Sequence, residues 1–246
     1  MVTTPTQNEI ARLAYKLKWT TVVQYRKHIS VESSFEENML TLLRQANVDH
    51  EEGLVKRRLK SASFPILKTL DTFDFNQARL PHLKREQILE LATCEFIKEK
   101  TNVVAVGNCG TGKTHLMTAI GLEAVRKGYS VKFRRVNDLL TQLSEAKSER
   151  QLNGMLNALL KCQLLILDEL GYVSLSLEDS KLLFQVLAGR YELRSTIITS
   201  NHEFSKWPAV IGDPIMAEAL VGRLVQRSSI LNMNGEGYRL RDRKKE

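Results

Sequence analysis

The chain has 246 residues, 43% of them hydrophobic and 26% charged, and its 36 Lys and Arg against 28 Asp and Glu give a formal net charge of +8. This balance excludes a disordered chain, and no apolar run approaches the roughly 18 residues that a membrane span needs. Residues 1–12 have no apolar signal-peptide core, so we expect a cytoplasmic protein without a membrane partner. The three cysteines, Cys94, Cys109 and Cys162, are widely spaced, which argues against a disulfide framework or a zinc site.

The positive charge is concentrated at the two ends of the sequence. Residues 1–60 carry a net charge of +3 and residues 223–246 a net charge of +4, whereas the segments between them carry 0 and +1. Basic ends around a nearly neutral centre are typical of a core flanked by segments that contact a polyanion. A solvated helix and a solvated tail would give the same pattern, so charge alone leaves both interpretations open.

The first third of the chain predicts a small helical domain. Apolar residues recur at helical spacing over residues 10–17. Ser33 and Glu36 then form a capping-box pattern ahead of a second apolar face over residues 35–46. These patterns predict two to four short helices.

A basic helix face and a proline follow this domain. Residues 54–60 alternate apolar positions with four basic ones, Lys56, Arg57, Arg58 and Lys60. Pro65 then interrupts regular structure. We therefore expect a helical N-terminal domain at residues 1–62, a connector at 63–75 and a second domain at 76–246.

In the second domain, short apolar runs alternate with amphipathic helical patterns, which is typical of a parallel sheet covered by helices on both faces. The predicted strands lie at residues 103–106, 131–133, 164–167, 196–199 and 230–233. Helices are expected at 113–127, at 136–160 as two helices, and at 180–193. Asp213 and Pro214 predict the cap and first position of a last helix. The predicted fold class is α/β, with a five-stranded parallel sheet between helices.

A glycine-rich segment follows the first predicted strand and fits the phosphate-binding pattern G-x-x-x-x-G-K-[ST]. Its members are Gly107, Asn108, Cys109, Gly110, Thr111, Gly112, Lys113 and Thr114. The glycines let backbone N–H groups turn toward a triphosphate at the positive end of the following helix. Lys113 is expected to contact the outer phosphates and Thr114 to bind Mg²⁺. The segment therefore predicts a site for ATP and Mg²⁺.

Polar residues end two further predicted strands. Asp168 and Glu169 follow a continuous apolar run, and Asn201 follows the next strand along the chain. We expect Asp168 to hold Mg²⁺ and Glu169 to polarise the attacking water. Asn201 is expected to orient that water or contact the last phosphate, although a turn-capping role is an alternative. Ligands bind beyond the carboxyl ends of parallel strands, so one site can use all these residues.

Seven segments together resemble a known family. They are FPILKTL with FDF (64–70 and 73–75), the phosphate loop, DELGY (168–172), LFQV (183–186), TSN (199–201), GRL (222–224) and GEGYRLR (235–241). In these segments the chain is similar to the IstB-type ATP-binding helper proteins of insertion sequences. Those proteins are relatives of DnaC-type helicase loaders within the AAA+ ATPases. Gly222 departs from the pattern, which has an Asp at this position.

The resemblance implies an AAA+ P-loop NTPase core that assembles with copies of itself around ATP, hydrolyses it, binds DNA and directs a transposase. It implies that Arg223 is an arginine finger inserted into a neighbouring subunit and that Arg239 is a second phosphate-sensing arginine. A purely structural role for either arginine stays open. The 45 residues after Asn201 are too few for a helix, a strand and a full helical lid, so we expect a core without a full C-terminal lid.

Candidate DNA contacts come from basic residues in three parts of the chain. These are Lys56, Arg57, Arg58 and Lys60, then Arg134 and Arg135, then Lys147 and Arg150. No aromatic residues interleave them and no DNA-reading motif is present, so phosphate contact with low sequence specificity is predicted. Each of these side chains taken alone is also typical of a solvated surface.

Two other functions share the phosphate-binding motif. A DnaC-type replicative helicase loader uses the same ATPase core with a different N-terminal partner. A small-molecule kinase needs a second substrate pocket and has no use for an arginine from a neighbouring subunit. ATP-dependent assembly on DNA distinguishes the kinase from the other two, and the protein partner distinguishes those two from each other.

Overall fold

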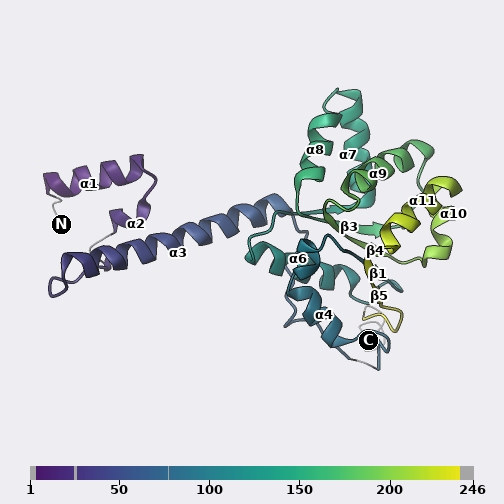
Figure 1. Cartoon of the computed structure of the whole chain (residues 1–246), viewed down its shortest axis with the longest axis horizontal. Coiled ribbons are helices and arrows are strands. Elements are labelled where there is room, and N and C mark those ends of the chain that lie inside the picture. Colours follow the sequence, from purple (N-terminus) through teal and green to yellow (C-terminus); the bar gives the residue numbers. More distant parts are fainter. Residues whose placement is uncertain (1–3, 25–26, 77, 239–246) are drawn as a thin grey trace, which may run out of the picture. The chain divides into compact units, whose positions relative to one another are not determined.

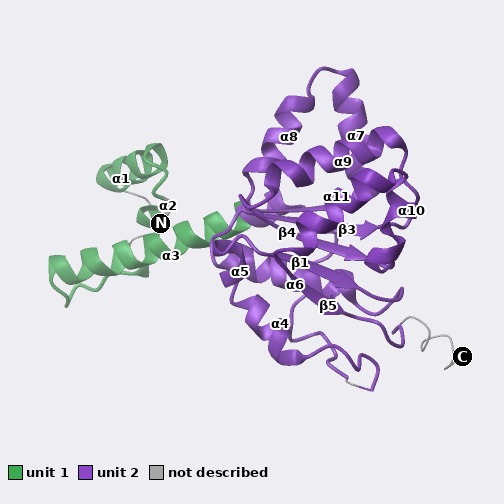
Figure 2. Ribbon diagram, turned by 45° about the vertical axis from the view of Figure 1, so that its right-hand side comes forward, with its two compact units in different colours: residues 1–57 green, residues 58–246 purple. Residues whose placement is uncertain are grey.

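Helices make up the N-terminal part of the chain, and a sheet covered by helices makes up the rest (Figure 1). The computed structural model describes residues 4–24, 27–76 and 78–238. It divides the chain into two units, residues 1–57 and 58–246, at a point inside one long helix (Figure 2). The domain limits that we drew from the sequence, at residues 62 and 75, stay a prediction.

One long helix replaces the short helices expected after residue 33. Helices α1 (Pro5–Lys16) and α2 (Thr20–Val23) are short, but α3 (Phe35–Ala62) has 28 residues. Its capping pair is one residue later than predicted, because the Ser34 hydroxyl accepts from the Glu37 N–H (3.2 Å) and the Glu37 carboxylate accepts from the Ser34 N–H (2.9 Å). The segment contains no proline, and a single glycine at position 53 costs only about 1 kcal/mol, so the helix is not interrupted.

Five parallel strands form the sheet of the second unit, which confirms the predicted fold class. They are β1 (Asn102–Val106), β2 (Val131–Arg135), β3 (Leu164–Leu170), β4 (Ser195–Ser200) and β5 (Ser228–Asn232). Their order in the sheet is β2-β3-β4-β1-β5, and every neighbouring pair is parallel. Because β3, β4 and β1 are neighbours, the residues that follow them meet at one edge of the sheet.

Helices cover both faces of this sheet (Figure 2). On one face lie α4 (Arg85–Ala92) and α6 (Lys113–Arg126), and the short α5 (Glu95–Lys98) leads into β1. The other face carries α7 (Val136–Ser148), α8 (Leu152–Lys161), α9 (Leu177–Arg190), α10 (Trp207–Ile211) and α11 (Pro214–Val225). Helix α9 begins three residues earlier than expected, because Ser176 and Asp179 form a capping box there.

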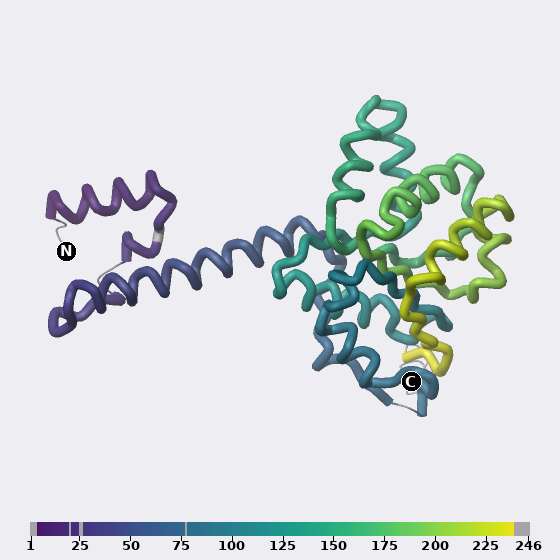
Figure 3. Tube along the Cα trace, viewed as in Figure 1, coloured from purple at the N-terminus to yellow at the C-terminus, as the bar shows by residue number. Residues whose placement is uncertain are grey.

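Strand side chains alternate between the two helical layers. Val104, Leu165 and Ile198 pack into a buried cluster with α7, α8, α9 and α11, whereas Ile166 lies against α6 at Gly121. From β5 to Tyr238, the last described residue, the chain forms no further helix, and it runs back to the segment before α4 (Figure 3). In the described ranges, none of the helices combines the length and the apolar character that crossing a membrane would require.

All three cysteines are free thiols. Burial raises the pKa of Cys94 to about 11 and also raises the pKa of Cys162. Both thiols are therefore protonated near neutral pH and poorly nucleophilic. Cys109 is exposed, in the phosphate loop.

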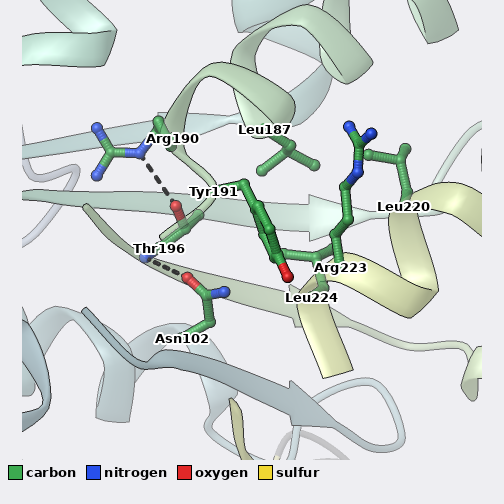
Figure 4. A pocket seen from close by; sticks show the side chains of 8 residues that line it. All are labelled: Asn102, Leu187, Arg190, Tyr191, Thr196, Leu220, Arg223 and Leu224. Carbon is green, nitrogen blue, oxygen red and sulfur yellow. Dashed lines mark hydrogen bonds between the residues drawn. The ribbon is translucent and has the colours of Figure 1, made fainter. Parts of the chain in front are cut away.

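Arg190 is a buried charge that joins α8, α9 and β4. Arg190 is 1% exposed, and its guanidinium donates to the Thr196 hydroxyl at 3.0 Å (Figure 4). It also donates to the backbone carbonyls of Ser195 (2.6 Å), Cys162 (2.9 Å) and Leu159. The carbonyls at the end of a helix lack partners within that helix. Arg190 therefore satisfies backbone groups that the core would otherwise leave unpaired.

Substitution of Arg190 by Met should destabilise the second unit strongly. Each buried carbonyl left unpaired costs about 1–3 kcal/mol, so we expect Arg190→Met to lose at least about 3 kcal/mol of unfolding free energy. Urea denaturation measures this loss. Arg194→Met is the matched control, because Arg194 is exposed and should change stability by less than about 0.5 kcal/mol. Equal stability of the two variants would contradict the structural role of Arg190.

Candidate nucleotide-binding site

The glycine-rich loop joins the buried strand β1 to the N-terminus of α6. Gly112 caps α6 with φ +89°, a left-handed conformation that glycine adopts without strain. A Cβ at this position would also lie 2.8 Å from Phe73 Cε2. The start of α6 lines a cavity at the carboxyl edge of the sheet, and N–H groups at a helix N-terminus can bind phosphate.

Lys113 holds the loop in its turn. Its Nζ donates to the carbonyls of Gly107 (2.6 Å) and Asn108 (2.7 Å), and the Thr111 hydroxyl donates to the same Asn108 carbonyl (2.9 Å). The ammonium group thus lies against the loop that is expected to surround the phosphates. We expect this flexible, charged side chain to contact an anion that binds in the loop.

Asp168 and Thr114 form the second part of the site. The Thr114 hydroxyl lies 3.0 Å from both carboxylate oxygens of Asp168, and the Thr199 hydroxyl donates to one of them at 2.5 Å. Asp168 is only 1% exposed. Hydroxyl groups orient a buried carboxylate, but they carry no formal charge to balance it. This donor set fits a hard divalent cation, since Mg²⁺ is typically held by one or two protein oxygens together with phosphate oxygens and water.

A bulge at the end of β3 aims two adjacent carboxylates at the same space. Consecutive strand residues normally point to opposite faces. Between Leu167 and Leu170 the pairing with β4 shifts register, and Glu169 takes φ +63°. As a result both Asp168 and Glu169 line one cavity. The Glu169 side chain is 47% exposed, and its carboxylate lies 3.6 Å from Arg135 Nε.

That cavity has a volume of about 470 Å³ and contains most of the predicted site. The predicted residues that line it are Cys109, Gly110, Gly112, Lys113, Thr114, Asp168, Glu169 and Asn201. Gly107, Asn108 and Thr111 belong to the loop itself. The sequence interpretation missed the far wall, which includes Ile66, Thr72, Phe73 and Asp74 of the connector with Tyr238. The signal that could have revealed this wall was the presence of aromatic and apolar residues in the connector, a segment without regular secondary structure.

A family model described as IstB-like ATP binding protein matches residues 13–246 of the chain. The chain belongs to this family. It is 37% identical to an insertion-sequence protein named for ATP binding (IS5376, Geobacillus stearothermophilus), over 92% of this chain and 89% of that protein. A similarly named protein of IS21 from Pseudomonas aeruginosa is 39% identical over 87% of this chain and 80% of its own length.

Solved structures with this fold include a helicase loader. The crystal structure of the DnaC helicase loader matches 72% of this chain and 98% of its own, with a TM-score of 0.56 and 25% identity. DnaI matches 67% of this chain and 90% of its own, with a TM-score of 0.57 and 22% identity. The IstB-like chain therefore has the P-loop fold of the AAA+ ATPases.

Arg223 of this IstB-like protein lies far from its own phosphate loop. Its guanidinium carbon is 5.1 Å from the Phe184 ring centre, and the side chain borders a small pocket that includes Asn102 (Figure 4). Asn102 begins β1, whereas the loop follows the end of β1, and five strand residues span about 13 Å. Arg223 is exposed, on α11. The other predicted arginine, Arg239, lies outside the described residues.

The predicted DNA contacts lie on several elements. Arg135 lines the nucleotide cavity, while Arg134 at the same strand end donates to the Phe133 carbonyl (2.6 Å). Lys147 pairs with Glu178 (2.9 Å) and Lys56 with Glu52 (3.6 Å), both on exposed surface. Arg57, Arg58 and Lys60 lie on α3, and Arg150 is exposed between α7 and α8. Their part in DNA binding stays a prediction.

Two substitutions in the cavity of this IstB-like protein should have different effects on ATP affinity. Lys113→Ala removes the ammonium expected at the phosphates, and we expect about 10- to 100-fold weaker binding, the value of a hydrogen bond to a charged group. Glu169→Gln should bind ATP within about twofold of wild type, because a water-activating group acts in the reaction and not in binding. Calorimetric titration with ATP measures both.

Lys98→Ala is the control for this comparison, because Lys98 is exposed on α5 and paired with Glu95. It should leave affinity unchanged. Equal loss of binding in Lys113→Ala and Glu169→Gln would contradict the two roles.

Proposed function

We propose that this protein is an ATP-dependent, DNA-binding transposition helper that assembles with copies of itself on DNA and directs or stimulates a partner transposase, with ATP hydrolysis as the switch. The observation that carries the proposal is the meeting of Lys113, the Thr114–Asp168 pair and Glu169 around one cavity. The relatives named for insertion sequences support the biological setting.

In this proposal the chain's own groups divide the work of hydrolysis. The loop N–H groups and Lys113 hold the phosphates, and the connector wall receives the nucleoside. Mg²⁺, held by Thr114 and Asp168, would neutralise charge on the outer phosphates. Glu169, more exposed than Asp168 and at the cavity, accepts a proton from the attacking water. Asn201 lines the same cavity and orients that water.

A neighbouring subunit supplies the remaining charge. Arg223 is exposed and lies at the opposite end of β1 from its own loop, which supports a role in another copy of the chain. Phe184 and Tyr191 lie beneath its guanidinium and limit the directions it can take. Arginines that act in this way contribute about 10³ to 10⁵ in rate in other nucleotide hydrolases.

A mixing experiment tests this assignment. Arg223→Ala should bind ATP but lose most hydrolysis, and Lys113→Ala should lose hydrolysis because its own loop is defective. Mixed assemblies contain contacts that join an intact loop to an intact arginine, so hydrolysis should partly recover. Phosphate release, measured on mixtures that sizing shows to co-assemble, checks this. Absence of recovery would mean that Arg223 serves its own subunit or the fold.

DNA binding should depend mainly on phosphate contacts. We therefore expect weak dependence on sequence and a steep fall in affinity with salt. The slope of the logarithm of the binding constant against the logarithm of the salt concentration should steepen by about 0.9 for each phosphate neutralised. Removal of Lys56, Arg57 and Arg58 together should flatten that slope if the basic face of α3 takes part. Fluorescence anisotropy with duplex DNA at several salt concentrations measures it.

A charge-matched control separates specific contacts from net charge. Loss of Lys98, Lys181 and Lys206, which are exposed on three separate elements, changes net charge by the same amount and should leave the slope nearly unchanged. Binding that ignores salt, or that strongly selects one sequence, would count against the proposal.

The alternative is a DnaC-type replicative helicase loader, which the likeness to the solved DnaC structure favours. Both functions use the same ATPase core, so the protein partner decides between them. Co-purification with a transposase encoded beside this chain supports the helper. Co-purification with a hexameric helicase supports the loader.

A further inference from the structure

The segment that follows β5 lies across the phosphate loop, and we call residues 233–238 the strap. The Tyr238 N–H donates to the Gly110 carbonyl (2.9 Å), and Asn108 Nδ2 donates to the Gly235 carbonyl (3.3 Å). A Cβ on Gly237 would lie 2.7 Å from the Cys109 carbonyl oxygen, so this approach requires glycine. The strap backbone therefore rests directly on the loop that is to hold the phosphates.

The Tyr238 side chain reaches from the strap to the connector (Figure 3 shows these two segments of the chain close together). Its hydroxyl donates a hydrogen bond to the Asp74 carbonyl, and its ring centre lies 6.4 Å from that of Phe73. The Arg79 guanidinium carbon lies 5.0 Å from the ring centre. Burial raises the pKa of the Tyr238 phenol, so the hydroxyl remains a donor near neutral pH.

Phe73 is the part of the connector wall that these contacts fix. It is 7% exposed, lies edge-on to His115 with ring centres 5.4 Å apart, and reaches Gly112 at the start of α6. His115 Nε2 lies 3.0 Å from the Thr69 carbonyl oxygen and so holds the connector before Phe73. Tyr238 holds it immediately after Phe73, at Asp74. The wall is thus fixed on both sides, by α6 and by the strap.

We propose that Tyr238 is a positioning residue whose hydroxyl holds the connector wall in place for the nucleoside of ATP, whereas the strap backbone at Gly237 and Tyr238 positions the phosphate loop. The proposal rests on the proposed use of this cavity for ATP. It predicts that the two contacts have separate effects on binding. Loss of the Tyr238 hydroxyl should weaken only ligands that carry a nucleoside, whereas displacement of the strap backbone should weaken every ligand that carries the phosphates.

The test compares two probes, Mg-ATP and Mg-tripolyphosphate, by calorimetric titration of the full chain. Tyr238→Phe keeps the ring and loses only the hydroxyl, so we expect ATP to bind about fivefold more weakly, the value of one hydrogen bond, and tripolyphosphate to bind as to wild type. Tyr129→Phe is the control for loss of a phenol hydroxyl away from the cavity, at the end of α6, and both probes should bind it normally.

Gly237→Ala should weaken both probes, because the added methyl group displaces the strap from the loop. Gly154→Ala in α8 is the matched control, since nothing lies within 4 Å of its added Cβ, and both probes should bind it normally. If Gly237→Ala fails to fold in thermal unfolding, Asn108→Ala removes a loop–strap hydrogen bond instead, and it should also weaken both probes.

Unchanged ATP binding by Tyr238→Phe would overturn the inference, as would an equal loss of both probes, which would make the hydroxyl a support for the loop or the fold. Unchanged binding of both probes by folded Gly237→Ala would overturn the role of the strap backbone. Wild-type protein that binds neither probe would overturn the proposed ATP site, and the inference with it. If the wild-type protein binds both probes, failure of this inference can be distinguished from failure of the proposed ATP site.

Discussion

The carboxyl end of β1 fixes the point at which the phosphate loop leaves the sheet. This strand is fully buried between β4 and β5 and is hydrogen-bonded to both. At its last residue the Met233 N–H donates to the Val106 carbonyl (2.7 Å), and the Gly107 N–H donates to the Ser200 carbonyl (3.2 Å). The loop therefore leaves the sheet from a point that is held on two sides. A loop fixed in this way can bind phosphate without first being ordered, which lowers the entropic cost of binding.

The environments of Asp168 and Glu169 explain how two adjacent carboxylates can serve different purposes. Asp168 is buried, and the hydroxyl groups of Thr114 and Thr199 hydrogen-bond to its carboxylate. Glu169 follows it in a left-handed conformation and is half exposed, in contact with solvent and Arg135. In the proposed function, the first environment is that of the metal ligand and the second that of the proton acceptor. The bulge in β3 is the local feature that separates them.

Local patterns predicted the sheet well and the cavity walls less well. The apolar runs, the glycine-rich loop and the acidic pair are contiguous in sequence, so β1, β3 and the residues that follow them were identified without the structure. The sequence predicted short helices in place of the long α3. The absence of proline, which lets a helix continue, is a weaker signal than the capping residues that start one. The connector wall and Tyr238 lie more than 160 residues apart in sequence, and their contact depends on the strap returning to the loop. No local pattern records such a contact.

The connector has two roles that link the nucleotide to the rest of the chain. It forms one wall of the cavity, and it is also the covalent link between α3 and the sheet domain, since α3 ends at Ala62 and Phe73 follows eleven residues later. His115 and Tyr238 hold the connector at Thr69 and Asp74. The basic residues Arg58 and Lys60 lie in that last part of α3, so the same short segment connects the ATP site to a candidate DNA contact.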